Sequence, residues 1–203
     1  GNRDGTWTVD DAYAFGPVLG PLDDWLVGEG THAMLYDRLG AHPIEHEGAA
    51  GVHFAVWAPN ARRVSVVGDF NGWDGRRHTM RKRVDTGVWE IFVPSLSEGT
   101  IYKYEIIGAQ GTLLPQKSDP VGFRAELRPS TASIVCATSG FAWSDGEWMA
   151  RRGQAEPRRT PMSCYEVHLG SWRRGDDGRW LTYDELAATL VPYAVDMGFT
   201  HVE

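Results

Sequence analysis

The sequence predicts a mainly β protein in which an antiparallel β-sandwich is followed by the first strand and helix of an α/β domain. Two observations lead to this fold class. Between residues 51 and 135, short stretches alternate apolar and polar residues and are separated by turn signals. In residues 163–203, a strand pattern is followed by a helical pattern and a second strand pattern. A chain of 203 residues has room for one large domain, or for one domain and part of another.

The alternation is clearest at Val52, Phe54 and Val56. In a strand these three side chains would point to one face of the sheet, and the residues between them to the opposite face. Asn71-Gly72 then gives a tight-turn signal. Short strands joined by turns in this way are typical of an antiparallel sandwich. The further strand predictions are residues 64–67, 88–93, 101–107 and 132–135.

The C-terminal pattern is that of a strand, a helix and a second strand. Residues 164–169 and 199–202 are the strand predictions, and Thr182 with Glu185 forms a capping box that begins the helix between them. Strands joined through a helix are parallel, and parallel strands are stable only when several pair and both faces are covered. We therefore expect residues 163–203 to be the beginning of a larger α/β domain.

The remaining segments lack such periodicity. Residues 22–27 and 34–38 favour one or two helical turns each, in a segment that is otherwise irregular. Residues 151–161 (RRGQAEPRRTP) are polar, contain four Arg and end at a proline. This run indicates a solvated linker in preference to an anion-binding patch. The expected organisation is an irregular segment with short helices at 1–47, the sandwich at 48–140, a linker at 141–162 and the incomplete α/β domain at 163–203.

Composition excludes several functions. The net charge is −7 and the basic residues are scattered, which argues against a nucleic-acid partner. No stretch reaches the roughly 20 apolar residues of a membrane helix, and residues 1–10 show no signal peptide. With only Cys136 and Cys164, a reducing cytoplasmic setting with both thiols buried is the simplest interpretation, and a single disulfide is the alternative.

Two motifs suggest cofactors, and we expect neither to bind one. His42, Glu45 and His46 have the spacing of an inverted zinc-protease motif, but that motif needs a helix and Pro43 makes a long helix improbable. Residues 28–33 (GEGTHA) resemble a dinucleotide loop, but no apolar strand precedes them. The sequence therefore predicts no metal and no organic cofactor.

A sugar-binding surface is the stronger hypothesis. The chain contains nine Trp, and Trp73 follows the Asn-Gly turn, where its ring could be exposed for stacking on a pyranose or simply be buried. Lys103 alternates with Tyr102 and Tyr104, so its ammonium points away from them and could bond sugar hydroxyls. A solvated lysine is the plain alternative.

The first predicted strand of the α/β domain carries Tyr165, Glu166 and His168. Core filling is the plain alternative for most residues there. Glycoside chemistry requires a pair of carboxylates that flank the bond. Glu166 and Glu203 qualify by residue type only, and we assign neither as a catalyst.

These residues together resemble known families. The sandwich is similar to the family-48 carbohydrate-binding module, an immunoglobulin-like β-sandwich, and nearly the whole chain closely resembles the bacterial glycogen branching enzyme family, whose catalytic domain is a (β/α)8 barrel of glycoside hydrolase family 13. The first resemblance rests on GVHFAVWAPNARRVSVVGDFNGW (51–73), GVWEIFVP (87–94) and YKYEI (102–106). The second rests on GEGTHAMLYDRLGAHP (28–43), SDPVGFRAELRPSTASIV (118–135), PMSCYEVHLGSWRR (161–174) and LTYDELAATLVPYAVDMGFTHVE (181–203).

The resemblance implies an activity for a longer protein. The family transfers an α-1,4-glucan segment to a 6-hydroxyl and so creates an α-1,6 branch, by a retaining mechanism with an Asp nucleophile and a Glu acid and base. Those catalysts are expected on barrel strands beyond Glu203, so this chain is expected to contain none of them and to be inactive alone. The implied partners are α-glucan and the remainder of the barrel.

The resemblance also implies site residues. Trp73 matches a ring-stacking position, Lys103 a hydroxyl-bonding position, and Thr131 a third contact. Tyr165 matches a tyrosine near the donor sugar. The second stacking Trp of the module is absent, because residues 108–114 read GAQGTLL. The sandwich could therefore serve chiefly as a packing partner of the barrel.

Two alternatives stay open. The first is a related trehalose-releasing or debranching hydrolase, which would share both domains. The second is a non-catalytic glycogen-binding module, which predicts a self-contained sandwich and no barrel strand.

Overall fold

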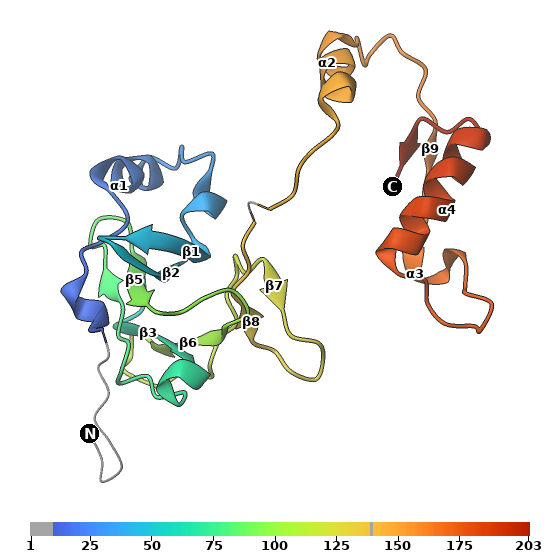
Figure 1. Cartoon of the computed structure of the whole chain (residues 1–203). Helices are drawn as coiled ribbons and strands as arrows, with labels where there is room; N and C mark the ends of the chain where they lie inside the picture. Colours follow the sequence, from blue (N-terminus) through green and yellow to red (C-terminus); the bar gives the residue numbers. More distant parts are fainter. Residues whose placement is uncertain (1–9, 139) are drawn as a thin grey trace. The chain divides into compact units, whose positions relative to one another are not determined.

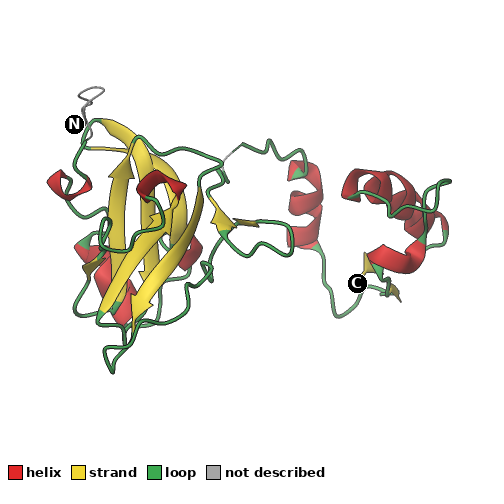
Figure 2. Cartoon of the chain, turned by 90° about the horizontal axis from the view of Figure 1, so that it is seen from below, coloured by secondary structure: helices red, strands yellow, loops and turns green. Residues whose placement is uncertain are grey.

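The computed structural model describes residues 10–138 and 140–203, which divide between residues 141 and 142 into two compact units (Figure 1). The first unit is a sandwich of two antiparallel four-stranded sheets, ordered β1-β2-β5-β4 and β3-β6-β8-β7, whose long strands lie face to face in Figure 2. The predicted fold class is confirmed. The strands of the first sheet are β1 (Gly40–His46), β2 (Ala49–Trp57), β4 (Arg81–Lys82) and β5 (Val88–Pro94); those of the second are β3 (Arg63–Gly68), β6 (Ile101–Ile107), β7 (Arg124–Ala125) and β8 (Ser133–Ile134).

The sandwich core forms where the inner faces of β2, β3, β5 and β6 meet. Phe54 of β2 lies edge-on to Tyr102 of β6, with ring centroids 5.0 Å apart. The hydroxyls of Tyr102 and Tyr104 both donate to one oxygen of the buried Asp119, at 2.7 and 3.0 Å. The predicted alternation is thereby confirmed: Val52 and Phe54 face the core, and so do both tyrosines.

Three edge strands, β1, β4 and β7, were not predicted. Residues 40–46, expected to be irregular, form the edge strand β1, which pairs with β2 from Gly40↔Ala55 to His46↔Ala49. Glu47 and Gly48 make the two-residue turn of this hairpin, both at positive φ (49° and 83°). Pro43 lowers the strand signal, but an edge strand tolerates proline because one of its sides needs no ladder bond.

Because residues 42–46 form a strand, the helix that a zinc motif requires does not arise. His42 Nε2 instead lies 2.9 Å from the carbonyl of Leu39, and His46 Nε2 lies 3.1 Å from the carbonyl of Gly16. The GEGTHA segment likewise follows a helix where a dinucleotide loop would follow a strand. Both motifs are structural here.

The N-terminal segment covers the outer face of the first sheet. It contains the 3-10 helix η1 (Ala12–Ala14), helix α1 (Pro21–Gly28) and the 3-10 helix η2 (Leu35–Asp37), so both predicted helical turns are confirmed. Leu19 and Leu39 pack on Ala55 and Val88, which point out of the sandwich. We call residues 10–39 the N-terminal cover.

The carboxylate of Glu90 on β5 anchors this cover. Glu90 is 1% exposed, yet its Oε2 accepts the backbone N–H groups of Val18 and Leu19 at 2.9 and 3.1 Å and the Nε2 of His53 at 3.1 Å. Arg83 donates to the other oxygen at 3.3 Å and also bonds Asp24 of α1. One buried anion therefore ties the sheet to two parts of the cover.

The charges of this cluster follow from its bonds. Burial alone would raise the pKa of Glu90, but the hydrogen bonds from His53, Leu19 and Val18 outweigh it and leave the pKa below its ordinary value. Burial lowers the pKa of His53 against the opposing pull of Glu90, so the imidazole is largely neutral at pH 7. The cluster therefore contains a carboxylate, a neutral imidazole and one guanidinium.

The second unit begins with helix α2 (Gly146–Gln154), followed by strand β9 (Cys164–Tyr165), helix α3 (Leu169–Trp172), helix α4 (Tyr183–Asp196) and strand β10 (His201–Val202). Strands β9 and β10 pair in parallel, which confirms the predicted strand, helix, strand unit. Thr182 and Glu185 form the predicted capping box. The strand predicted at 164–169 is shorter: β9 ends at Tyr165, and Leu169 belongs to α3.

The predicted linker contains a helix, and the expectation for the thiols is corrected. Arg151 and Arg152 of the predicted linker lie in the last turn of α2, where cations suit the carbonyl end of a helix. The thiols were expected to be buried, but Cys164 is exposed and Cys136 is half-buried, and both are free. Within the described ranges, no helix is long and apolar enough to cross a bilayer. The signal-peptide prediction concerns residues 1–10, of which 1–9 lie outside the described residues.

We predict that Glu90→Ala destabilises the 203-residue chain by about 3–5 kcal/mol. The substitution removes one member of a buried ionic cluster and leaves its partners without an acceptor. Urea unfolding followed by circular dichroism measures this difference. Glu45→Ala removes an exposed carboxylate from the same sheet and serves as the matched control, with an expected change within about 0.5 kcal/mol. Equal effects of the two substitutions would contradict the anchoring role of Glu90.

Candidate functional site: the Trp73 surface

The turn that carries Trp73 is built around a buried asparagine. Residues 69–71 form the 3-10 helix η3 (Asp69–Asn71), and the Asn71 side chain folds back into the protein, 2% exposed. Its Oδ1 accepts the N–H of Gly68 at 3.1 Å, and its Nδ2 donates to the carbonyl of Val66 at 2.9 Å. At the end of β3, the Asn71 side chain therefore bonds backbone groups that a neighbouring strand would otherwise bond.

These bonds also fix the state of His78. Because Asn71 must present its Nδ2 toward Val66, the same NH₂ group donates to His78 Nδ1, 3.0 Å away. The Nδ1 atom therefore carries a lone pair, and the ring proton of the neutral imidazole is on Nε2. Burial lowers the pKa of His78, as does the neighbouring Arg77, while Asp11 opposes them.

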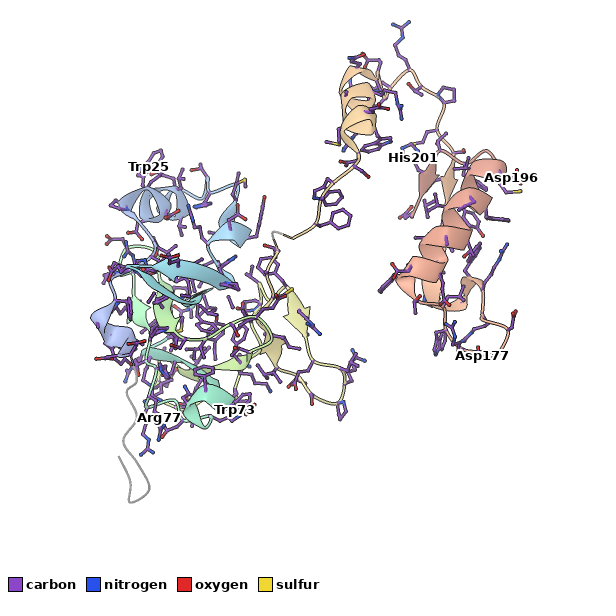
Figure 3. All side chains as sticks on the ribbon, in the orientation of Figure 1. Trp25, Trp73, Arg77, Asp177, Asp196 and His201 are labelled. Atoms are coloured by element: carbon purple, nitrogen blue, oxygen red, sulfur yellow. The ribbon has the colours of Figure 1, made fainter. Side chains whose placement is uncertain are left out.

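The backbone directs Trp73 outward. Gly72 and Trp73 both adopt left-handed conformations, with φ of 66° and 59°. For a tryptophan this conformation costs roughly 1 kcal/mol, and the bond from its N–H to the carbonyl of Gly68 (2.9 Å) helps to hold it. The side chain is half-buried, and its Nε1 donates to Asp69 Oδ1 at 2.7 Å. Figure 3 labels Trp73 beside η3.

Lys103 lies on the outer face of the neighbouring strand β6. Its neighbours Tyr102 and Tyr104 are buried in the core, so the predicted alternation is confirmed. The Nζ atom donates to Thr131 Oγ1 at 2.6 Å. Thr131 is exposed just before β8, and Ser118 donates to its carbonyl. Two of the three residues predicted for sugar binding are therefore in direct contact.

The Trp73 turn lies over this same face. Gly75, two residues beyond Trp73, sits against the carboxylate of Glu105, which follows Lys103 by two residues and so shares its face. A side chain at residue 75 would collide with that carboxylate, which is also paired with Arg63 of β3. The turn that carries Trp73 is therefore packed, at Gly75, on the sheet face that carries Lys103. We call Trp73, Lys103 and Thr131 the Trp73 surface.

The Trp73 surface has the chemistry of a sugar site. An indole ring offers an apolar plane for the C–H face of a pyranose, while an ammonium and a hydroxyl can bond sugar hydroxyls. At residues 108–112 the chain turns, and the stretch 108–114 (GAQGTLL) contains no aromatic residue. The surface therefore offers one aromatic plane in that region.

Tyr165, the fourth predicted residue, belongs to a separate aromatic cluster in the second unit. Its ring stacks on Phe199 with centroids 4.9 Å apart, and its hydroxyl accepts the Nε1–H of Trp172 at 3.0 Å. Tyr193 of α4 lies 5.8 Å from the same ring. These contacts turn Tyr165 toward helix α4. Its proximity to a donor sugar stays a prediction.

Glu166, His168 and Glu203 line one pocket at the carboxyl ends of β9 and β10. The backbone N–H of Val167 donates to the carbonyl of Glu203 at 2.8 Å, which extends the parallel ladder beyond the two strands. Active-site residues of barrels gather at this end of the strands. The two carboxylates are brought together by the fold, but neither carries an assigned role.

Comparison with known proteins bears on these sites. Residues 38–122 match the family model described as Carbohydrate-binding module 48 (Isoamylase N-terminal domain). Over 202 residues, 100% of its length, the chain is 60% identical to the 1,4-alpha-glucan branching enzyme GlgB of Rhizobium meliloti. The similarity to branching enzymes therefore extends over the whole chain. The chain is also 62% identical over 199 residues, 97% of its length, to the enzyme of the same name from Roseobacter denitrificans, and it spans 27% of the length of each of these branching enzymes.

Solved structures show the same fold. The chain resembles the maltotriose complex of the pullulanase PulA from Klebsiella pneumoniae, with a TM-score of 0.56 and 21% identity over 84% of this chain and 20% of that one. The apo pullulanase of the same organism gives a TM-score of 0.55 and 23% identity, with the same coverage. Identities of 21–23% to the pullulanases support the fold alone, whereas the branching enzymes are similar to this chain in sequence.

Sequence reasoning missed the residues that support Trp73. Asp69 and Asn71 were recognised only as part of a turn motif, and His78 was not singled out. A weak signal for Asn71 exists, because asparagine side chains often bond nearby backbone in turns. No local pattern could have identified His78, whose contact with Asn71 depends on the pairing of residues 78–80 along β3.

We predict that acidification destabilises the chain through His78. A lowered folded pKa means that the unfolded state binds more protons, so stability is full above the unfolded value near 6.5 and is lost as the pH falls through the folded pKa. Protonation places an Nδ1–H against the Asn71 NH₂ group and breaks their bond. Urea unfolding at pH 7.5 and 5.5 measures the loss. His78→Gln, whose amide oxygen still accepts, should lose less on acidification, and an unchanged loss would count against this role.

Proposed function

We propose that the chain is the N-terminal part of a 1,4-α-glucan branching enzyme. The whole protein transfers an α-1,4-glucan segment to a 6-hydroxyl and forms the α-1,6 branches of glycogen. The observation that carries this proposal is the 60% identity to a branching enzyme across the full length of the chain. The cytoplasm, where glycogen synthesis takes place, is the proposed location.

In this proposal the chemistry belongs to the longer protein. Retaining transfer needs a nucleophile and an acid that flank the glycosidic bond. We assign neither role within residues 1–203, and both are proposed to lie on later strands of the barrel that β9, α4 and β10 begin. No cofactor is required for this reaction.

The remainder of that barrel is the proposed partner of the second unit. Helix α4 buries Leu186, Leu190 and Ala194 against its own unit, whereas Val191 and Val195 stay 55% and 69% exposed. Parallel strands need cover on both faces and several paired neighbours. Further strands and helices of the barrel would supply that cover.

The Trp73 surface is the proposed glucan contact of the first unit. It would bind one stretch of α-glucan by stacking a glucose ring on Trp73 while Lys103 and Thr131 bond hydroxyls. The contact of Lys103 with Thr131 and the packing of the Trp73 turn on the sheet face of Lys103 support this role. With one aromatic plane, binding is expected to be weak.

The alternatives are less well supported. A debranching or trehalose-releasing hydrolase would share both domains, but the similarity to pullulanases rests on 21–23% identity and concerns the fold alone. A free-standing glycogen-binding module would end with the sandwich, whereas this chain continues into β9, α4 and β10.

We predict that the 203-residue chain does not branch amylose, because the proposed catalytic carboxylates lie outside it. Amylose incubated with the chain should keep its iodine colour, and debranching of the product should release no new short chains. Branching by these residues alone would overturn our placement of the catalysts.

We predict that Trp73→Ala weakens glycogen binding about fivefold, because stacking of one ring is worth about 1 kcal/mol. Affinity electrophoresis of the chain through gels with increasing glycogen measures this change. Trp57→Ala is the matched control: Trp57 is exposed on the other sheet, where its Nε1 donates to the carbonyl of Thr86, and its loss should leave retardation unchanged. Unaltered retardation of the Trp73 variant would remove this residue from the proposed site.

A further inference from the structure

The backbone of the Trp73 turn places the residue but leaves its ring undirected. Asn71 and the left-handed backbone at Trp73 fix where the side chain leaves the chain. Beyond the Cα atom of Trp73, the two side-chain torsions χ1 and χ2 decide which way the indole plane faces. A platform for a sugar ring needs that plane in one orientation, so a second device must hold it.

Asp69 supplies this device. Its Oδ1 accepts the indole Nε1–H at 2.7 Å, from a position four residues earlier on the same turn. Bonds to an ionised acceptor are short and about twice as strong as neutral ones. Asp69 is exposed, and no cation pairs with it among residues 10–138 and 140–203. Its carboxylate is thus available to Trp73.

The bond also changes what Trp73 offers to a ligand. The Nε1–H group is the only polar group of the indole. With that group satisfied by Asp69, the free part of the ring is an apolar plane, and hydroxyl recognition is left to Lys103 and Thr131. A ring held before binding loses less freedom when a sugar stacks on it.

We propose that Asp69 is a positioning residue for glucan binding, which acts by holding the Trp73 indole as a preorganised platform. This inference rests on the proposed glucan contact at the Trp73 surface. It assigns Asp69 no contact with the sugar.

Affinity electrophoresis of the full chain in glycogen compares four variants with the parent. Asp69→Ala should raise the dissociation constant about threefold, by the freedom returned to one side chain. Asp69→Asn keeps an oxygen that can accept the Nε1–H and should restore most of the affinity. Asp74→Ala removes an equal charge from the same loop, where Asp74 pairs with Arg76, and should bind like the parent. Trp73→Ala removes the indole ring and gives the reference dissociation constant for a surface without it.

A second measurement reports the bond itself, in the absence of glucan. In a ¹H–¹⁵N spectrum, the indole N–H resonance of Trp73 is identified by its loss in Trp73→Phe. Asp69→Ala should shift this resonance upfield, as expected when a hydrogen bond to a carboxylate is lost. Asp69→Asn should shift it less, and Asp74→Ala should leave it in place.

The outcomes separate the two proposals. If Trp73→Ala weakens binding and Asp69→Ala does not, the positioning role is wrong and the glucan contact stands. If Asp69→Asn binds as poorly as Asp69→Ala while its indole resonance stays in place, the carboxylate acts on the sugar directly and the positioning role is again wrong. If Trp73→Ala binds like the parent, the proposed glucan contact itself fails.

Discussion

The buried carboxylate of Glu90 is the constraint on which the first unit depends. It lies on the face of β5 that points away from the sandwich core, where water would otherwise solvate it. Backbone N–H groups of the N-terminal cover, together with His53 and Arg83, take the place of that water. An anion without these partners would be too costly to bury, so the sheet and its cover are stable only together.

This arrangement decides which surface is available for binding. The outer face of the first sheet is closed by the N-terminal cover, with Leu19 and Leu39 packed on it. The outer face of the second sheet carries Lys103 and Thr131 instead, and the turn that carries Trp73 packs on this face at Gly75. The two sheets therefore have different tasks: one binds the N-terminal segment of its own chain, and the other presents the candidate sugar surface.

The second unit is held together by an aromatic cluster and by a helix cap. Tyr165, Trp172, Tyr193 and Phe199 pack together and set α4 against β9. The capping box at Thr182 fixes where the helix begins. Strands β9 and β10 form a two-stranded parallel sheet, and the chain spans 27% of the length of the branching enzyme from Rhizobium meliloti.

Five strands of the sandwich (β2, β3, β5, β6 and β8) and the helix cap at Thr182 could be predicted from the sequence, because alternation, capping and turn signals depend on neighbours along the chain. The sequence did not reveal strand β1, whose pattern is obscured by Pro43 at a sheet edge, or the two-residue strands β4 and β7. Three contacts are seen only in the folded protein: Glu90 binds the N-terminal cover, Lys103 donates to Thr131, and Asp69 accepts the indole N–H of Trp73. The first two contacts join residues 72 and 28 positions apart, and the third depends on a side-chain torsion, so no local pattern encodes them.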